Sequence, residues 1–215
     1  MSMIKDEDRK HLEQHFKDLK NEVRIVVFTQ KHECHFCQTN RDLLEDVASM
    51  SEKIKLEVKD FMADKKLAGE LGIDKIPATA VMGDEDYGIR FYGIPAGYEF
   101  TTLIETIMMV GSGASGLPKE VLDELAKVKK PVHLQVLISP TCPYCPMAVL
   151  AAFKLALESK HVRSDMVEVS EFPYYPNKYN MKGVPHTVIN EETSAVGAMP
   201  EKELLEKIRE AISEV

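Results

Sequence analysis

Apolar and polar positions alternate along the chain in an order that occurs twice. Runs rich in β-branched and aromatic residues have the composition of strands, and between them apolar residues recur at helical spacing. In the first half the pattern predicts helices at about 5–20, after 37, ending near 72 and at about 99–110, and strands at about 24–29, 55–61, 79–82 and 89–92. The second half repeats the plan, with helices expected at 118–129, through 147–153 and at the end of the chain, and strands at 132–138, 165–169 and 187–189 before a short turn.

This repetition predicts two domains of similar construction. Strands alternating with helices, followed by two strands separated by a short turn, are typical of α/β domains with a mixed sheet covered on both faces. Residues 111–116, Gly-Ser-Gly-Ala-Ser-Gly, are the only Gly/Ser-rich stretch and follow a predicted helix rather than a strand, so they indicate a linker and not a dinucleotide-binding loop. We therefore expect domains at 1–116 and 117–215.

Composition narrows the classes of function. The 215 residues are 44% hydrophobic and 29% charged, as in ordinary globular proteins, and the net charge of −8 argues against binding to nucleic acid or to an anionic membrane. No stretch approaches the roughly 18 apolar residues that span a bilayer, and the N-terminus lacks the apolar core of a signal peptide. We expect a cytoplasmic protein, and the few Gln and Asn with abundant Glu and Lys are typical of a thermophile.

The candidate chemistry lies in two Cys-x-x-Cys motifs that use all four cysteines. The first begins at Cys34 and the second at Cys142, 108 residues later, and each is followed 40 positions after its second cysteine by an apolar-Pro pair, Ile76-Pro77 and Val184-Pro185. In a reducing cytosol such pairs are more often catalytic or metal-binding than structural, although disulfide-rich hyperthermophile cytosols are an exception. The chain is thus an internal duplication with its chemistry repeated.

Each half has the same order: a strand, a Cys-x-x-Cys motif, a helix and a downstream apolar-Pro pair. This repeated order, with Cys-Pro-Tyr-Cys in the second half, resembles that of the glutaredoxin-like protein disulfide oxidoreductases of thermophilic archaea and bacteria. The resemblance covers essentially the whole chain. It implies two tandem thioredoxin-like domains, each a central mixed β-sheet flanked by helices. It further implies that Pro77 and Pro185 are cis and that the backbones of Ile76 and Val184 bind an extended client segment.

Disulfide exchange requires a thiolate, and a free cysteine with a pKa near 8.5 is mostly protonated at neutral pH. A helix N-terminus lowers that pKa, so Cys34 and Cys142 are the expected nucleophiles. Cys37 and Cys145, one turn further on, are the expected resolving thiols that release the client. We expect the Cys142 pair to be the stronger general reductase.

The residues between the cysteines are expected to tune each pair. Pro143 stiffens its turn and, with Tyr144, completes a sequence like that of glutaredoxins. His35, beside Phe36, would favour the Cys34 thiolate if cationic; alternatively it is a solvated loop residue.

The chain also departs from the patterns of the families that it resembles. It has no Trp, and Phe28 and Val136 occupy the positions of the buried Asp of thioredoxins, so the internal proton acceptor is unassigned. Of the glutathione-binding residues of glutaredoxins only Val184-Pro185 is kept and no Gly-Gly occurs, so glutathione is not the expected substrate.

The sequence therefore predicts a thiol–disulfide oxidoreductase that reduces, forms or isomerises disulfides in client proteins. No cofactor would be bound, and electrons would come from an NAD(P)H-dependent, thioredoxin reductase-like flavoprotein. One alternative is an electron carrier that supplies a peroxiredoxin, like the N-terminal module of bacterial peroxiredoxin reductases. The non-enzymatic alternatives are a zinc site, disfavoured because 104 residues separate the pairs, and structural disulfides, disfavoured because such short loops add little stability.

Overall fold

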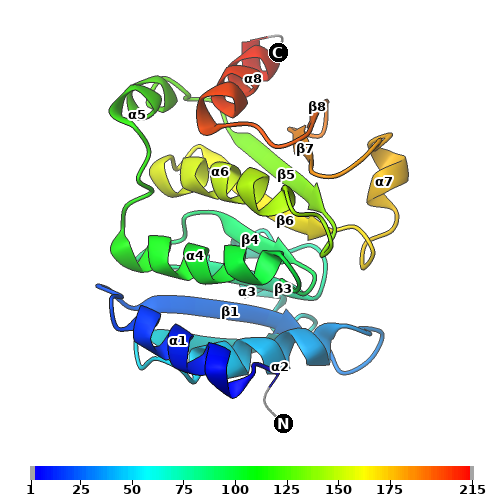
Figure 1. Cartoon of the computed structure of the whole chain (residues 1–215). Coiled ribbons are helices and arrows are strands. Elements are labelled where there is room, and N and C mark those ends of the chain that lie inside the picture. The colour runs from blue at the N-terminus through cyan, green and yellow to red at the C-terminus, as the bar shows by residue number, and fades with distance from the viewer. Residues whose placement is uncertain (1–2, 214–215) are drawn as a thin grey trace.

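The structure, a computed structural model, describes residues 3–213 as a single mixed sheet with helices on both faces (Figure 1). The helices are α1 (Asp6–Phe16), α2 (Cys37–Ala48), α3 (Lys65–Glu70), α4 (Glu99–Ser112), α5 (Lys119–Leu125), α6 (Cys145–Glu158), α7 (Tyr175–Lys178) and α8 (Glu201–Ser213). The strands are β1 (Val23–Thr29), β2 (Ile54–Asp60), β3 (Ala78–Met82), β4 (Ile89–Tyr92), β5 (Val132–Ile138), β6 (Val162–Glu168), β7 (His186–Ile189) and β8 (Thr193–Val196).

The two halves of the sheet repeat one topology. In each half the first strand pairs in parallel with the second and antiparallel with the third, and the third pairs antiparallel with the fourth, which gives the orders β2-β1-β3-β4 and β6-β5-β7-β8. The halves join because β4 pairs in parallel with β6, with Tyr92 opposite Val167. The predicted mixed sheets are confirmed, and the structure adds that they form one continuous eight-stranded sheet.

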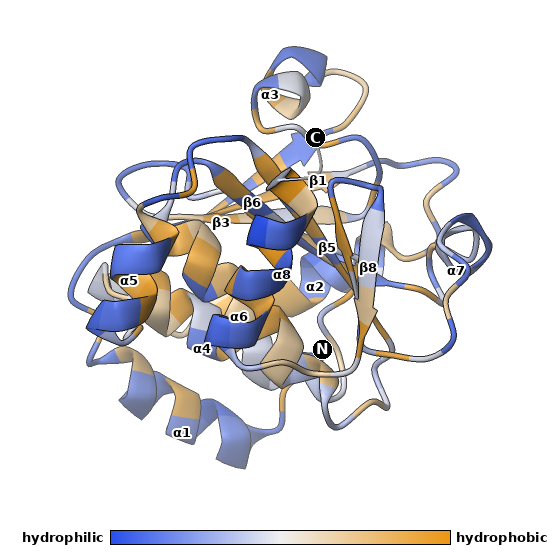
Figure 2. Cartoon of the chain, turned by 90° about the horizontal axis from the view of Figure 1, so that it is seen from above, coloured by the Kyte–Doolittle hydropathy of each residue, from blue (hydrophilic) through white to orange (hydrophobic). Residues whose placement is uncertain are grey.

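Helices cover both faces of this sheet, as Figure 2 shows for α4, α6 and α8 on one side and α3 on the other. Alternate residues of each strand point to opposite faces, so Val81 and Ile189 pack under the first helical layer while Ala80 and Val188 pack under the second. The first layer is continuous across the two halves, since α4 contacts α6. Both Cys-x-x-Cys motifs thereby follow strands of one continuous sheet. Within residues 3–213 no helix is long and apolar enough to cross a bilayer.

A buried ionic group reinforces the junction between β4 and β6. Asp165 is fully buried, accepts a hydrogen bond from Arg163 Nε at 3.0 Å and lies 2.7 Å from His133 Nε2. Arg163 also donates to the hydroxyl of Tyr92 in the other half at 2.9 Å. Desolvation would raise the pKa of Asp165, but His133 and Arg163 outweigh it and hold that pKa below its usual value.

Several local predictions differ from the structure: α1 ends at Phe16 rather than near 20, and β6 begins at Val162 rather than at 165. Helix α4 runs through Gly111 and Ser112, the first residues of the predicted linker. A Cβ at Gly111 would lie 2.5 Å from Leu19 Cδ2, so a glycine at this position lets the helix pack closely. The helix ends where Gly113 adopts the left-handed conformation, at φ 68°. Helix α5 ends at Leu125 rather than near 129, and the Tyr/Pro-rich connection contains the unpredicted α7. The domain boundary after 116 stays a prediction.

Candidate active site

Both Cys-x-x-Cys motifs lie in a strand-to-helix connection. They follow β1 and β5, and the second cysteine of each pair, Cys37 or Cys145, is the first residue of α2 or α6. Each pair is a disulfide, with Cα–Cα distances of 5.4 Å for Cys34–Cys37 and 5.5 Å for Cys142–Cys145. The first cysteine lies three residues before the start of the helix, so the positive end of the helix dipole can favour a thiolate there.

The two cysteines of each pair differ in access to solvent. Cys37 and Cys145 are buried at 1% and 0% exposure, whereas Cys34 is half-buried and Cys142 retains 7% exposure. The first cysteine of each pair is therefore the more exposed of the two. This burial supports the predicted division into nucleophile and resolving thiol.

An apolar-Pro pair precedes the third strand of each half. The Ile76–Pro77 and Val184–Pro185 peptide bonds are both cis, as the resemblance implies. Each proline carbonyl is held by a glycine beyond the following hairpin: Gly93 N–H donates to Pro77 at 3.0 Å, and Gly197 N–H donates to Pro185 at 2.8 Å. Among residues 3–213, neither Ile76 nor Val184 uses its backbone in a hydrogen bond, so both remain able to pair with an added strand.

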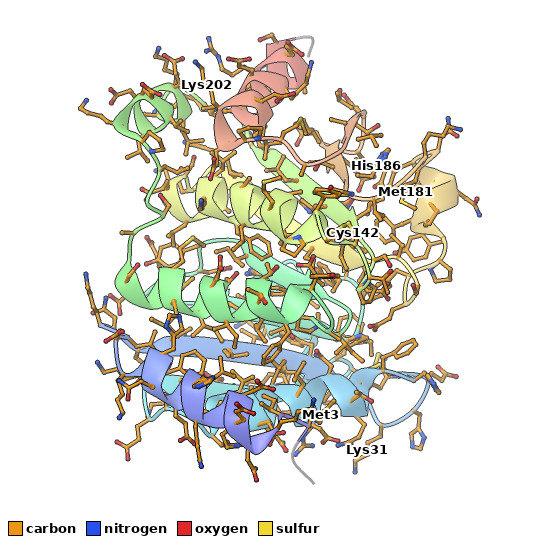
Figure 3. The ribbon with its side chains drawn as sticks, viewed as in Figure 1. Met3, Lys31, Cys142, Met181, His186 and Lys202 are labelled. Carbon is orange, nitrogen blue, oxygen red and sulfur yellow. A yellow bond between two sulfur atoms is a disulfide. The ribbon has the colours of Figure 1, made fainter. Side chains whose placement is uncertain are left out.

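The two redox pairs lie at the same edge of the sheet. Strands β1 and β5 run in the same direction, with β3, β4 and β6 between them, so their carboxyl ends meet one edge. Strands β1 and β5 are separated by four strand spacings of about 4.8 Å, or about 19 Å. Figure 3 shows Cys142 and Lys31, in the loop before Cys34, on the same side of the molecule. Within the described chain no three Cys, His, Asp or Glu side chains form a metal-binding group.

The predicted tuning residues occupy the exposed turn of each motif. His35 is exposed, and its ring lies edge-on to Phe36 with 4.9 Å between centroids. Pro143 and Tyr144 are also exposed, Tyr144 at 66%. Their effect on the thiols stays a prediction.

Sequence reasoning missed a buried carboxyl group near the second pair. Glu99 is completely buried at the start of α4, and no hydrogen bond of normal geometry reaches either of its carboxylate oxygens. Desolvation raises its pKa to about 7. The N–H of the preceding Tyr98 donates to the carbonyl of Pro140 at 3.2 Å, which ties this end of α4 to the loop before Cys142. Acidic residues are common in a first helical turn, so nothing in the sequence marked this one as buried.

Two further titratable groups at this edge were also missed. Glu171 accepts a hydrogen bond from Ile94 N–H at 2.7 Å, across the junction of the halves, and desolvation raises its pKa to about 7. His186, directly after Pro185, is buried without a hydrogen-bond partner on either ring nitrogen, and desolvation lowers its pKa. No motif singles out either residue.

The sequence of the chain is similar to those of known redox proteins. The family model described as Thioredoxin domain matches residues 132–210. NADH dehydrogenase of Bacillus subtilis is 26% identical over 201 residues, which cover 92% of this chain and 36% of that protein. The alkyl hydroperoxide reductase AhpF of Staphylococcus aureus is 26% identical over 169 residues, covering 78% of this chain and 31% of that protein. The chain thus spans about a third of the length of these curated relatives.

Two solved structures match this chain over nearly the full length of both superposed chains. The N-terminal domain of alkyl hydroperoxide reductase AhpF from Enterococcus faecalis superposes with a TM-score of 0.89 at 26% identity, covering 95% of this chain and 99% of that one. A protein disulfide oxidoreductase from Aeropyrum pernix superposes with a TM-score of 0.91 at 30% identity, covering 96% and 93%. With this match, and with a disulfide in each Cys-x-x-Cys motif, the chain belongs to the thioredoxin-fold protein disulfide oxidoreductases.

Proposed function

We propose that each Cys-x-x-Cys pair exchanges its disulfide with client proteins, with Cys34 and Cys142 as nucleophiles and Cys37 and Cys145 as resolving thiols. One observation carries this assignment: in each half the first cysteine is more exposed than the second, which is at most 1% exposed. Each such pair belongs to a half that also holds a cis-proline preceded by an unpaired backbone.

Reduction of a client by the second pair takes two steps. The Cys142 thiolate attacks one sulfur of the client disulfide, forming a mixed disulfide while the other client sulfur leaves as a thiolate and takes up a proton. The Cys145 thiolate then attacks Cys142 Sγ, which releases the remaining client thiol and leaves the Cys142–Cys145 disulfide. Two electrons have passed to the client, and an external dithiol must restore the reduced pair. The reverse sequence forms a client disulfide.

Client binding uses the residue before each cis-proline. The free N–H and C=O of Val184 add a client segment as an extended strand, which places its cysteine against Cys142. Ile76 provides the same backbone groups for the Cys34 pair. This mode recognises extended polypeptide rather than a fixed sequence.

We also propose that an NAD(P)H-dependent flavoprotein reductase supplies the electrons, that the chain itself binds no cofactor, and that it works in the cytoplasm. The relatives named NADH dehydrogenase and alkyl hydroperoxide reductase support a link to nicotinamide-dependent reduction. Their likeness also favours the second candidate function, an electron carrier that supplies a peroxiredoxin.

The test is a redox titration against thiol–disulfide buffers, in which alkylation and mass spectrometry report each pair separately. We expect both potentials between about −120 and −270 mV, the range of disulfide-exchange catalysts. Values below about −300 mV would identify structural disulfides and refute the proposal. In parallel, Cys142→Ser should lose most insulin-reducing activity and Cys34→Ser less; a Cys142→Ser protein that keeps most activity contradicts the ranking of the two pairs.

A further inference from the structure

A buried amide side chain lies on the same helix face as the second cysteine of the first pair. Asn40 follows Cys37 by three residues on α2, and both side chains are at most 1% exposed. Residues three apart share one face of a helix, and helical side chains lean back toward the N-terminus of their helix. The Asn40 amide therefore extends toward Cys37.

One end of this amide is anchored and the other is not. Asn40 Nδ2 donates to Thr79 Oγ1 at 3.2 Å, and Thr79 is on β3, two residues after Pro77. Asn40 Oδ1 is shielded from solvent, yet within residues 3–213 it has no hydrogen-bond partner. A buried acceptor without a donor costs free energy, so Oδ1 destabilises the protein in the oxidised state that the structure represents.

Reduction creates a donor beside this acceptor. In the oxidised pair Cys37 Sγ is bonded to Cys34 Sγ and carries no hydrogen. An external dithiol that breaks this bond passes two electrons and two protons to the pair and itself becomes a disulfide. Cys37 then carries an S–H group, which can donate a hydrogen bond.

The second half has no such amide. The position three residues after Cys145 is Ala148, which is also buried. Both halves keep the buried threonine two residues after the cis-proline, Thr79 and Thr187. Because the halves share one topology, the amide at position 40 is a chemical difference between two otherwise equivalent sites.

We propose that Asn40 Oδ1 accepts a hydrogen bond from Cys37 S–H in the reduced first pair and thereby raises the reduction potential of that pair. This inference deepens the proposed function and rests on it. The hydrogen bond exists only in the reduced state, so the first pair accepts electrons more readily than it would with an apolar residue at position 40. Ala148 provides no acceptor, in keeping with the prediction that the second pair is the stronger reductase.

The test is a titration of the full chain against thiol–disulfide buffers, with alkylation and mass spectrometry reporting each pair separately. We expect Asn40→Ala and the similarly sized Asn40→Leu each to lower the equilibrium constant for reduction of the first pair about fivefold, which lowers its potential by about 20 mV. The second pair of the same molecules should keep its potential. Val47→Ala is the matched control: this buried position further along α2 affects both redox states alike, so the potential of the first pair should not change.

A second measurement reports the hydrogen bond directly. In a protein whose other three cysteines are replaced by serine, Cys37 gives the only S–H stretching band in the infrared spectrum. A hydrogen bond lowers the frequency of this band, so adding Asn40→Leu should raise it, whereas adding Val47→Ala should not.

The outcomes separate this inference from the proposed function. If both Asn40 variants leave the potential of the first pair unchanged, or if Asn40→Leu does not move the S–H band, the hydrogen bond is refuted while the proposed function stands. A wild-type first pair that stays oxidised in every buffer overturns the proposed function for that pair, independently of the S–H band.

Discussion

Glu99→Gln should make the stability of the oxidised protein less dependent on pH. Glu99 is buried without a hydrogen bond of normal geometry to its carboxylate, and its pKa rises from 4.5 to about 7 because burial penalises the charged form. A carboxyl with a raised folded-state pKa favours the folded state at low pH, and this contribution is lost as pH rises from below 4.5 through about 7.

The magnitude follows from the pKa change. At about 1.4 kcal/mol per pKa unit, ionisation of Glu99 costs the folded state about 3 kcal/mol at pH 8 and about 1 kcal/mol at pH 5. The uncharged amide of Glu99→Gln carries no such cost. Between pH 5 and pH 8 the variant should therefore gain about 2 kcal/mol of unfolding free energy relative to the wild type.

Guanidinium unfolding followed by far-ultraviolet circular dichroism, at pH 5 and pH 8 with both disulfides intact, measures this difference. The matched control is Glu105→Gln, an exposed carboxyl on the same helix, which should show no such gain. If wild type and Glu99→Gln differ by the same free energy at both pH values, Glu99 is not a carboxyl of raised pKa, and the reasoning from its burial is wrong.

Two further predictions concern the scaffold. Asp165→Asn should lower the unfolding free energy by about 3 kcal/mol in guanidinium titrations, because it leaves Arg163 at the junction of the halves without its buried counter-charge; a loss below about 1 kcal/mol would contradict a structural role for this ion pair. Gly97→Ala should lower the melting temperature by at least 2–4 °C, about 1 kcal/mol, since its Cβ would lie 2.3 Å from the carbonyl oxygen of Pro140. Gly116→Ala, also at positive φ but with open space around it, is the matched control; an equal shift in both variants would show that backbone strain, and not the contact with Pro140, decides the effect.

Much of the fold could be predicted because its signals are local. The strand before each motif was predicted within one residue, since β-branched residues cluster there and a charged or turn segment ends each run. Short elements without a periodic pattern were not predicted. Helix α7 has four residues and begins beside a proline, so it is too short to show a helical pattern of apolar residues. The glycines at 111 and 113 have the same sequence signal, yet one packs inside α4 and the other ends it.

The sequence by itself determined the chemistry: two cysteine pairs, a proline at matched spacing after each, and the duplication that carries them. These depend on residue identity and on separations along the chain. Tertiary structure alone decided that β4 pairs with β6, that both pairs share one edge of the sheet, and that Glu99 is buried. Hydrogen bonds between strand edges and the desolvation of a side chain depend on which distant segments meet in space, and no local pattern of residues records that.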